Sequence, residues 1–147
     1  MKIRPSIVLI REQKIMFLRY NYAGNDLYQF PGGNMEEVET LEQTLARELN
    51  EEVGLTVDIK NLLLTAQVIN TQKKQATLHC LFLGESSQGA VPLLNKAESS
   101  AHEVVWMDID KLDQLNLYPS VGKEIKEILQ KNTSTPQYLG LIEQPWL

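Results

Sequence analysis

The stretch from Thr40 to Leu55 constrains the fold most, because it encodes a helix with both ends specified. Apolar residues recur every fourth position, at 41, 45, 49 and 53, and make one stripe along the helix. Thr40, with Gln43 three residues later, is a capping box. Gly54 follows the last turn, where a left-handed residue commonly ends a helix. The stripe must be buried, so the sequence predicts that this helix packs against a sheet.

The same region is strongly acidic. From 36 to 52 it carries seven glutamates against a single basic residue, Arg47. At about 100° per residue, Glu48, Glu51 and Glu52 share one helix face that borders the apolar stripe. Like charges at this spacing destabilise a helix, and partial burial adds to the cost. A hard divalent cation reverses this effect, because it prefers carboxylate oxygens. The pattern therefore indicates a cation site, with a solvated acidic surface as the alternative.

The rest of the chain is nearly neutral, since the whole carries a net charge of −5. It has no basic stripe for nucleic acid or an anionic membrane, and no apolar run long enough to span a bilayer. The single cysteine, Cys80, lies in an apolar run and is expected to be a buried core thiol. We expect one domain over residues 1–147, a reducing cytoplasmic location, and neither a nucleic-acid nor a membrane partner.

Short apolar runs alternate with helical stretches along the chain, which favours an α+β or layered α/β fold. The first two strands are expected to form a hairpin through Glu12 and Gln13. The expected strands are 3–11, 14–20, 27–30, 62–70, 76–83 and 103–107, and the expected helices are 40–53, 108–115 and 121–131. The polar stretch 84–101 is expected to be a loop.

The acidic segment resembles the Nudix box, the signature of the Nudix hydrolases, without a departure. The matching residues are Gly33, Glu39, Arg47, Glu48, Leu49, Glu51, Glu52, Gly54 and Leu55. The resemblance implies an α+β fold, an α/β/α sandwich in which a mixed sheet lies between helices and the box forms a loop–helix–loop.

The resemblance also implies a chemistry, the hydrolysis of a nucleoside diphosphate linked to another moiety, with Mg²⁺ or Mn²⁺ as cofactor. ADP-ribose or nucleotide-sugar substrates are favoured. By position, Glu48 and Glu52 are expected as metal ligands, joined by Glu51 and the carbonyl of Gly33. Either Glu48 or Glu51 would orient the attacking water. The remaining pair, Arg47 and Glu39, would brace the loop against the helix. A nucleotide-binding or regulatory module without turnover is the alternative.

Candidates outside the box are less constrained. Many Nudix hydrolases add a further acid, for which Glu103 and Glu98 are candidates. Arg19 is expected to meet a phosphate. Tyr28 and Trp106 are possible platforms for a base, as are Tyr20, Tyr22 and Tyr118, although each is also a candidate core or rim residue. His79 alternates with its neighbours on a strand, which places it on the side facing solvent or a cleft.

The final stretch, 132–147, is too apolar for a solvated terminus, and Pro136 and Pro145 resist helix. We expect an extended tail that packs either on its own sheet edge or on a second copy of the chain. A homodimer contact is the favoured arrangement.

Overall fold

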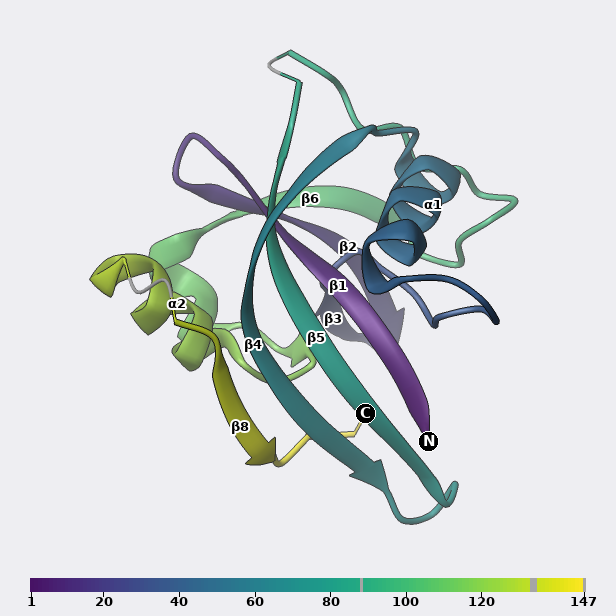
Figure 1. Cartoon of the computed structure of the whole chain (residues 1–147), viewed down its shortest axis with the longest axis vertical. Helices are drawn as coiled ribbons and strands as arrows, with labels where there is room; N and C mark the ends of the chain where they lie inside the picture. Colours follow the sequence, from purple (N-terminus) through teal and green to yellow (C-terminus); the bar gives the residue numbers. More distant parts are fainter. Residues whose placement is uncertain (88, 133–134, 147) are drawn as a thin grey trace.

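A computed structural model describes residues 1–87, 89–132 and 135–146 (Figure 1). Its main feature is a strongly curled, eight-stranded mixed sheet. The strands are β1 (Lys2–Arg11), β2 (Lys14–Tyr22), β3 (Asn25–Gln29), β4 (Val57–Asn70), β5 (Gln75–Ser86), β6 (Glu103–Asp108), β7 (Leu117–Tyr118) and β8 (Gln137–Leu141). The helices are α1 (Leu41–Val53), the 3₁₀-helix η1 (Ile109–Gln114) and α2 (Gly122–Lys131).

Strand β1 joins the two halves of the sheet. The strand order is β7-β3-β2-β1-β5-β4-β8, with β6 paired to β2 outside this path. At its end β1 turns back into β2 through Glu12 and Gln13, which both adopt positive φ, and the two strands pair antiparallel. Over residues 2–9 it instead runs parallel to β5. The predicted hairpin is confirmed, and β1 passes from one half of the sheet to the other between Leu9 and Ile10.

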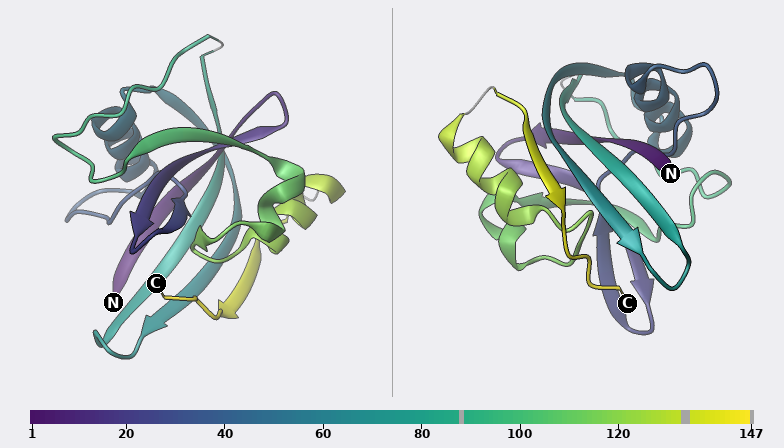
Figure 2. Two further views of the ribbon diagram at one scale, coloured as in Figure 1. Left: turned by 180° about the vertical axis from the view of Figure 1, so that it is seen from behind. Right: turned by 60° about the horizontal axis from the view of Figure 1, so that its bottom comes forward.

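Both faces of this junction are buried, because consecutive residues of a strand point to opposite faces. Ile7 and Leu9 of β1 pack in the core that includes the α1 stripe. Val8 packs in the second core, which α2 covers with Ile125 and Ile128. The helices α1 and α2 accordingly lie on opposite sides of the strands (Figures 1 and 2). The expected α+β arrangement, a mixed sheet between helices, is confirmed.

The predicted elements exist, but several boundaries were wrong. Strand β4 begins at Val57 and β5 continues to Ser86, so both strands are longer than expected. The expected helix at 108–115 is a 3₁₀-helix, and the two-residue strand β7 was not foreseen. His79 was wrongly expected to face solvent or a cleft, since it is fully buried. Cys80 is 5% exposed, as expected of a core thiol.

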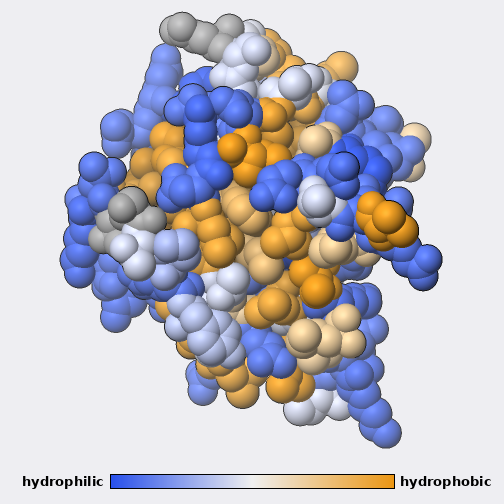
Figure 3. Space-filling model, in the orientation of Figure 1, coloured by the Kyte–Doolittle hydropathy of each residue, from blue (hydrophilic) through white to orange (hydrophobic). Residues whose placement is uncertain are grey.

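The C-terminal tail lies along its own sheet. Strand β8 pairs parallel with β4, and the N–H of Ile142 donates to the carbonyl of Gln67 at 3.0 Å. Apolar residues gather over these strands on the face shown in Figure 3, and Ile69 and Leu141 are exposed. A homodimer contact stays a prediction, and Leu147, part of that argument, lies outside the described residues. No helix in the described ranges is both long and apolar enough to cross a membrane.

Candidate active site

The helix α1 has the ends that the sequence predicted. The side chain of Thr40 accepts from the N–H of Gln43, and the Gln43 side chain accepts from the N–H of Thr40. Gly54 adopts φ 67°, and its N–H donates to the carbonyl of Asn50 at 3.0 Å. The N–H of Leu55 turns back to the carbonyl of Leu49. These contacts fix the rotation of the helix, so the acidic face has a defined direction.

Arg47 fastens the loop before α1 to the helix. Its Nε and Nη2 donate to the two oxygens of Glu39 at 2.8 and 3.0 Å. Glu39 also accepts from the N–H of Glu36 and the hydroxyl of Thr44. These bonds, first the one from Arg47 and then the one from Glu36, lower the pKa of Glu39 to about 2. The paired carboxylate is therefore a fixed anion that closes the loop, as the resemblance implied.

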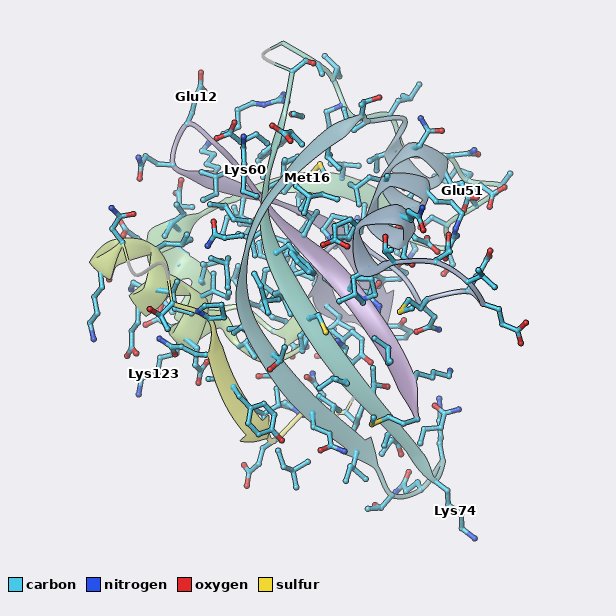
Figure 4. The ribbon with its side chains drawn as sticks, viewed as in Figure 1. Glu12, Met16, Glu51, Lys60, Lys74 and Lys123 are labelled. Carbon is cyan, nitrogen blue, oxygen red and sulfur yellow. The ribbon has the colours of Figure 1, made fainter. Side chains whose placement is uncertain are left out.

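The same guanidinium organises the acidic face. Its Nη1 donates to Glu48 at 2.9 Å and to Glu51 at 3.4 Å. The Glu48 side chain is 19% exposed, whereas the Glu51 side chain is 41% exposed and points away from the sheet (Figure 4). Burial raises the pKa of Glu48, and the bond from Arg47 opposes that shift. Arg47 thus holds two carboxylates of one face together despite their repulsion.

Glu52 is the most buried of the three glutamates on this face. It is 8% exposed, and within the described part of the chain its Oε1 has no hydrogen-bond partner. Burial, and next the charge of Glu48, raise the pKa of Glu52 to about 7. A buried carboxylate oxygen without a partner is costly. A divalent cation would supply the missing partner, because Mg²⁺ and Mn²⁺ take oxygen ligands of this kind.

Gly33 allows the loop to approach this face. A Cβ added at Gly33 would lie 2.3 Å from the carboxyl carbon of Glu48, so any side chain here would displace that carboxylate. The N–H of Gly33 donates to the carbonyl of Pro5 at 3.2 Å, which ties the loop to β1. Backbone and carboxylate oxygens are therefore close together, and the donor set fits a hard cation.

In this structure the guanidinium of Arg47 gathers Glu48 and Glu51. Among residues 1–87, 89–132 and 135–146, no three acidic, histidine or cysteine side chains converge closely enough to hold a metal. The structure therefore does not bring Glu103 to the box glutamates. Its carboxylate accepts from Nε of Arg19 at 2.8 Å, and Glu98 is exposed.

The three predicted substrate contacts have partners elsewhere. Arg19 also pairs with Asp26 at 3.1 Å. Tyr28 packs edge-on against Phe17 in the core that α2 covers. Trp106 packs against the core that includes the α1 stripe, and the guanidinium of Arg11 lies 5.0 Å from its ring. Their assignment to substrate stays a prediction.

Arg4 was missed by the sequence reasoning. This residue of β1 is 8% exposed and donates to the hydroxyl of Ser6 at 2.5 Å and to the carbonyl of Phe30 at 3.3 Å. Burial lowers its pKa, while the charge of Glu52 acts in the opposite direction. The guanidinium is a buried cation beside the acidic face. A charged residue that directly precedes the apolar run of the first strand was the available signal.

The chain also matches known proteins. A sequence model of the NUDIX domain matches residues 2–130. The NAD-capped RNA hydrolase NudC of Edwardsiella ictaluri is 30% identical over 131 residues, 88% of this chain and 47% of that protein. The ADP-ribose pyrophosphatase of Methanocaldococcus jannaschii is 27% identical over 109 residues, 74% of this chain and 62% of that protein. The chain thus spans less than two thirds of the length of either relative.

The fold has solved counterparts as well. A MutT protein from Bacillus halodurans superposes with a TM-score of 0.72 at 18% identity, over 99% of this chain and 92% of that chain. This likeness shows the fold, and the match over residues 2–130 shows the family that the box indicated. The chain belongs to the Nudix hydrolase family.

Proposed function

We propose that this chain is a metal-dependent pyrophosphohydrolase that cleaves the diphosphate linkage of a nucleoside diphosphate joined to another moiety. The observation that carries the proposal is the unpartnered, buried Oε1 of Glu52, which lies on the face that also presents Glu48 and Glu51. A surface helix has no reason to bury a carboxylate oxygen that has no hydrogen-bond partner. A cation site does have a reason to bury it, because the charge of the ion offsets the loss of water around the carboxylate.

Glu48, Glu51, Glu52 and the carbonyl of Gly33 would hold Mg²⁺ or Mn²⁺. When bound, such an ion neutralises phosphate oxygens and makes water easier to deprotonate. Arg47 keeps Glu48 and Glu51 in register, since its Nη1 donates to both. Either of these two carboxylates would orient the attacking water and accept its proton, because both are more accessible than Glu52. Glu39 in turn keeps Arg47 in place through two hydrogen bonds.

The favoured substrates are ADP-ribose and nucleotide sugars. One relative of this chain carries the name ADP-ribose pyrophosphatase, which supports this class. Another is called an NAD-capped RNA hydrolase, so a capped RNA belongs in any substrate panel and tests the expectation that nucleic acid is not a partner. A cytoplasmic location, expected from the single cysteine, stays a prediction.

The test is a product-release assay over ADP-ribose, nucleotide sugars, dinucleoside polyphosphates, nucleoside triphosphates and a capped RNA, with and without Mg²⁺. We expect metal-dependent release from at least one diphosphate, and loss of nearly all turnover in Glu52→Gln. Glu42→Gln is the matched control, because Glu42 is an exposed glutamate on the same helix. If the wild-type protein binds nucleotides but releases no product from any substrate, the module without turnover is the better description.

A further inference from the structure

A cavity of about 260 Å³ opens between the β2–β3 hairpin, β7 and the C-terminal tail. Its walls are largely aromatic and amide side chains, including Tyr22, Gln29, Tyr118, Gln144 and Trp146. The volume is below the roughly 300–1,000 Å³ that holds a whole small ligand. It therefore suits one part of a ligand, such as a flat ring. None of the box glutamates lines this cavity.

The tail that forms one wall lies beyond residue 130, where the match to the NUDIX domain ends. Gln144 fastens this tail to the loop around β7. Its amide oxygen accepts from the N–H of Ser120 at 2.7 Å, and its amide nitrogen donates to the carbonyl of Leu117 at 3.0 Å. The oxygen and the nitrogen of the Gln144 amide thus both help to fix the position of the residues that follow, Pro145 and Trp146.

The consequence is an aromatic pair in the cavity wall, of which Trp146 is exposed and Tyr118 is half-buried. The ring of Trp146 lies 6.0 Å from the ring of Tyr118 at an angle of 47°. Trp146 is 50% exposed although it is a large aromatic residue. Leaving such a ring half in water is costly unless something stacks on it. Two tilted rings with a gap beside them offer a flat group both a face and an edge.

Tyr118 also contacts two buried polar side chains. The guanidinium of Arg4 lies 5.7 Å from the Tyr118 ring, and the imidazole of His79 lies edge-on at 4.9 Å. His79 is fully buried, and in the described residues neither ring nitrogen has a hydrogen-bond partner. Two polar side chains are thus buried beside Tyr118, where a packed core would place apolar ones. Of these, Arg4 also interacts with the charge of Glu52.

We propose that the tail 135–146 is a specificity element of the active site, and that Trp146 with Tyr118 receives the base of a nucleoside diphosphate substrate. The proposal rests on the proposed function and names the substrate half that the cavity takes. The base enters the aromatic cavity, and the phosphates extend past Arg4 toward the box glutamates. Trp146 is then a residue that selects a substrate with an aromatic base, and Gln144 is a positioning residue that acts through it.

The test compares ligands that differ only in the base. Binding of AMP and of ribose 5-phosphate is measured by calorimetry without metal, for the wild type, Trp146→Ala, Trp146→Phe and Gln144→Ala. Tyr138→Ala is the matched control, because Tyr138 is an exposed aromatic of the same tail that does not line the cavity. Kinetics with ADP-ribose and Mg²⁺ follow on the same proteins, and circular dichroism confirms that each is folded.

Trp146→Ala should weaken AMP binding by about tenfold or more, as loss of one stacking partner does. Ribose 5-phosphate binding should stay unchanged. Trp146→Phe should restore AMP affinity to within about threefold of the wild type, and Gln144→Ala should weaken it as Trp146→Ala does. With ADP-ribose, Trp146→Ala should raise KM and retain kcat, the sign of lost uniform binding.

Equal AMP affinity and equal KM in Trp146→Ala and wild type would overturn the proposal, even if turnover showed the proposed function to be right. A wild-type protein that binds AMP no more tightly than ribose 5-phosphate would also overturn it. Conversely, AMP binding that depends on Trp146 in a protein without turnover would support the inference and refute the proposed function.

Discussion

Replacing Glu52 with glutamine tests the physical basis of the site without any substrate. In the metal-free protein, the pKa of Glu52 lies at about 7 rather than at the ordinary 4.5. A group whose pKa is raised by folding stabilises the protein at low pH and loses that contribution as pH rises through the folded value. The difference corresponds to about 3 kcal/mol between the two protonation states. Ionised Glu52 should therefore destabilise the metal-free fold above neutral pH.

The assay is chemical denaturation of the wild type, Glu52→Gln and Glu42→Gln, with a chelator, between about pH 5 and about pH 8. Over this window the free energy of unfolding of Glu52→Gln should rise relative to the wild type by about 2–3 kcal/mol. Glu42→Gln should track the wild type. Excess Mg²⁺ should then reverse the order, because the ion stabilises only the protein that binds it. A difference between Glu52→Gln and wild type that does not change with pH would refute the reasoning.

Three further predictions follow from single features. In Gly54→Val, a β-branched residue at φ 67° should cost about 1 kcal/mol or more and lower activity by shifting Glu51 and Glu52; equal melting temperature and activity would contradict this. Burial lowers the pKa of His79 to about 3, so the protein loses stability as pH falls below about 6.5, where the unfolded chain takes up this proton. By about pH 5.5 the wild type should lose about 1 kcal/mol in free energy of unfolding that His79→Leu retains; the same pH dependence of this free energy in both proteins would contradict this. Truncation after Lys131 removes β8 and the packing of Leu139 and Ile142, which should cost about 2–4 kcal/mol; an unchanged melting temperature would contradict this. Light scattering on the intact and the truncated chain tests the predicted homodimer contact, and this prediction is wrong if the intact chain has the mass of a monomer.

The sequence predicts what depends on local rules. The capping box at Thr40 and the left-handed Gly54 are set by neighbours in the chain, so the helix and the direction of its acidic face follow from them. Spacing also indicates that Glu48 and Glu52 border the buried stripe. The hairpin through Glu12 and Gln13 is equally local.

What the sequence does not predict depends on contacts between distant residues. Arg4 comes to lie near Glu52 because β1 runs beside the loop of the box, a proximity that no local pattern encodes. The buried His79 lies edge-on against Tyr118, which belongs to a strand of only two residues far along the chain. The tail lies beside Tyr118 because Gln144 bonds to Ser120 and Leu117 and the ring of Trp146 packs against that of Tyr118. Each of these placements requires the three-dimensional course of the chain.

Proton release on metal binding tests most directly whether the carboxylate of Glu52, whose Oε1 has no hydrogen-bond partner in the described residues, is a ligand of the divalent cation. Near pH 6 the carboxyl group is largely protonated, because its pKa lies at about 7, and a cation must displace that proton. Calorimetric titration with Mn²⁺ in buffers of different ionisation enthalpy counts the protons released. The wild type and Glu42→Gln should release close to one proton more per ion bound than Glu52→Gln, which should also bind Mn²⁺ more weakly. Equal proton release and equal affinity in all three proteins would contradict the account.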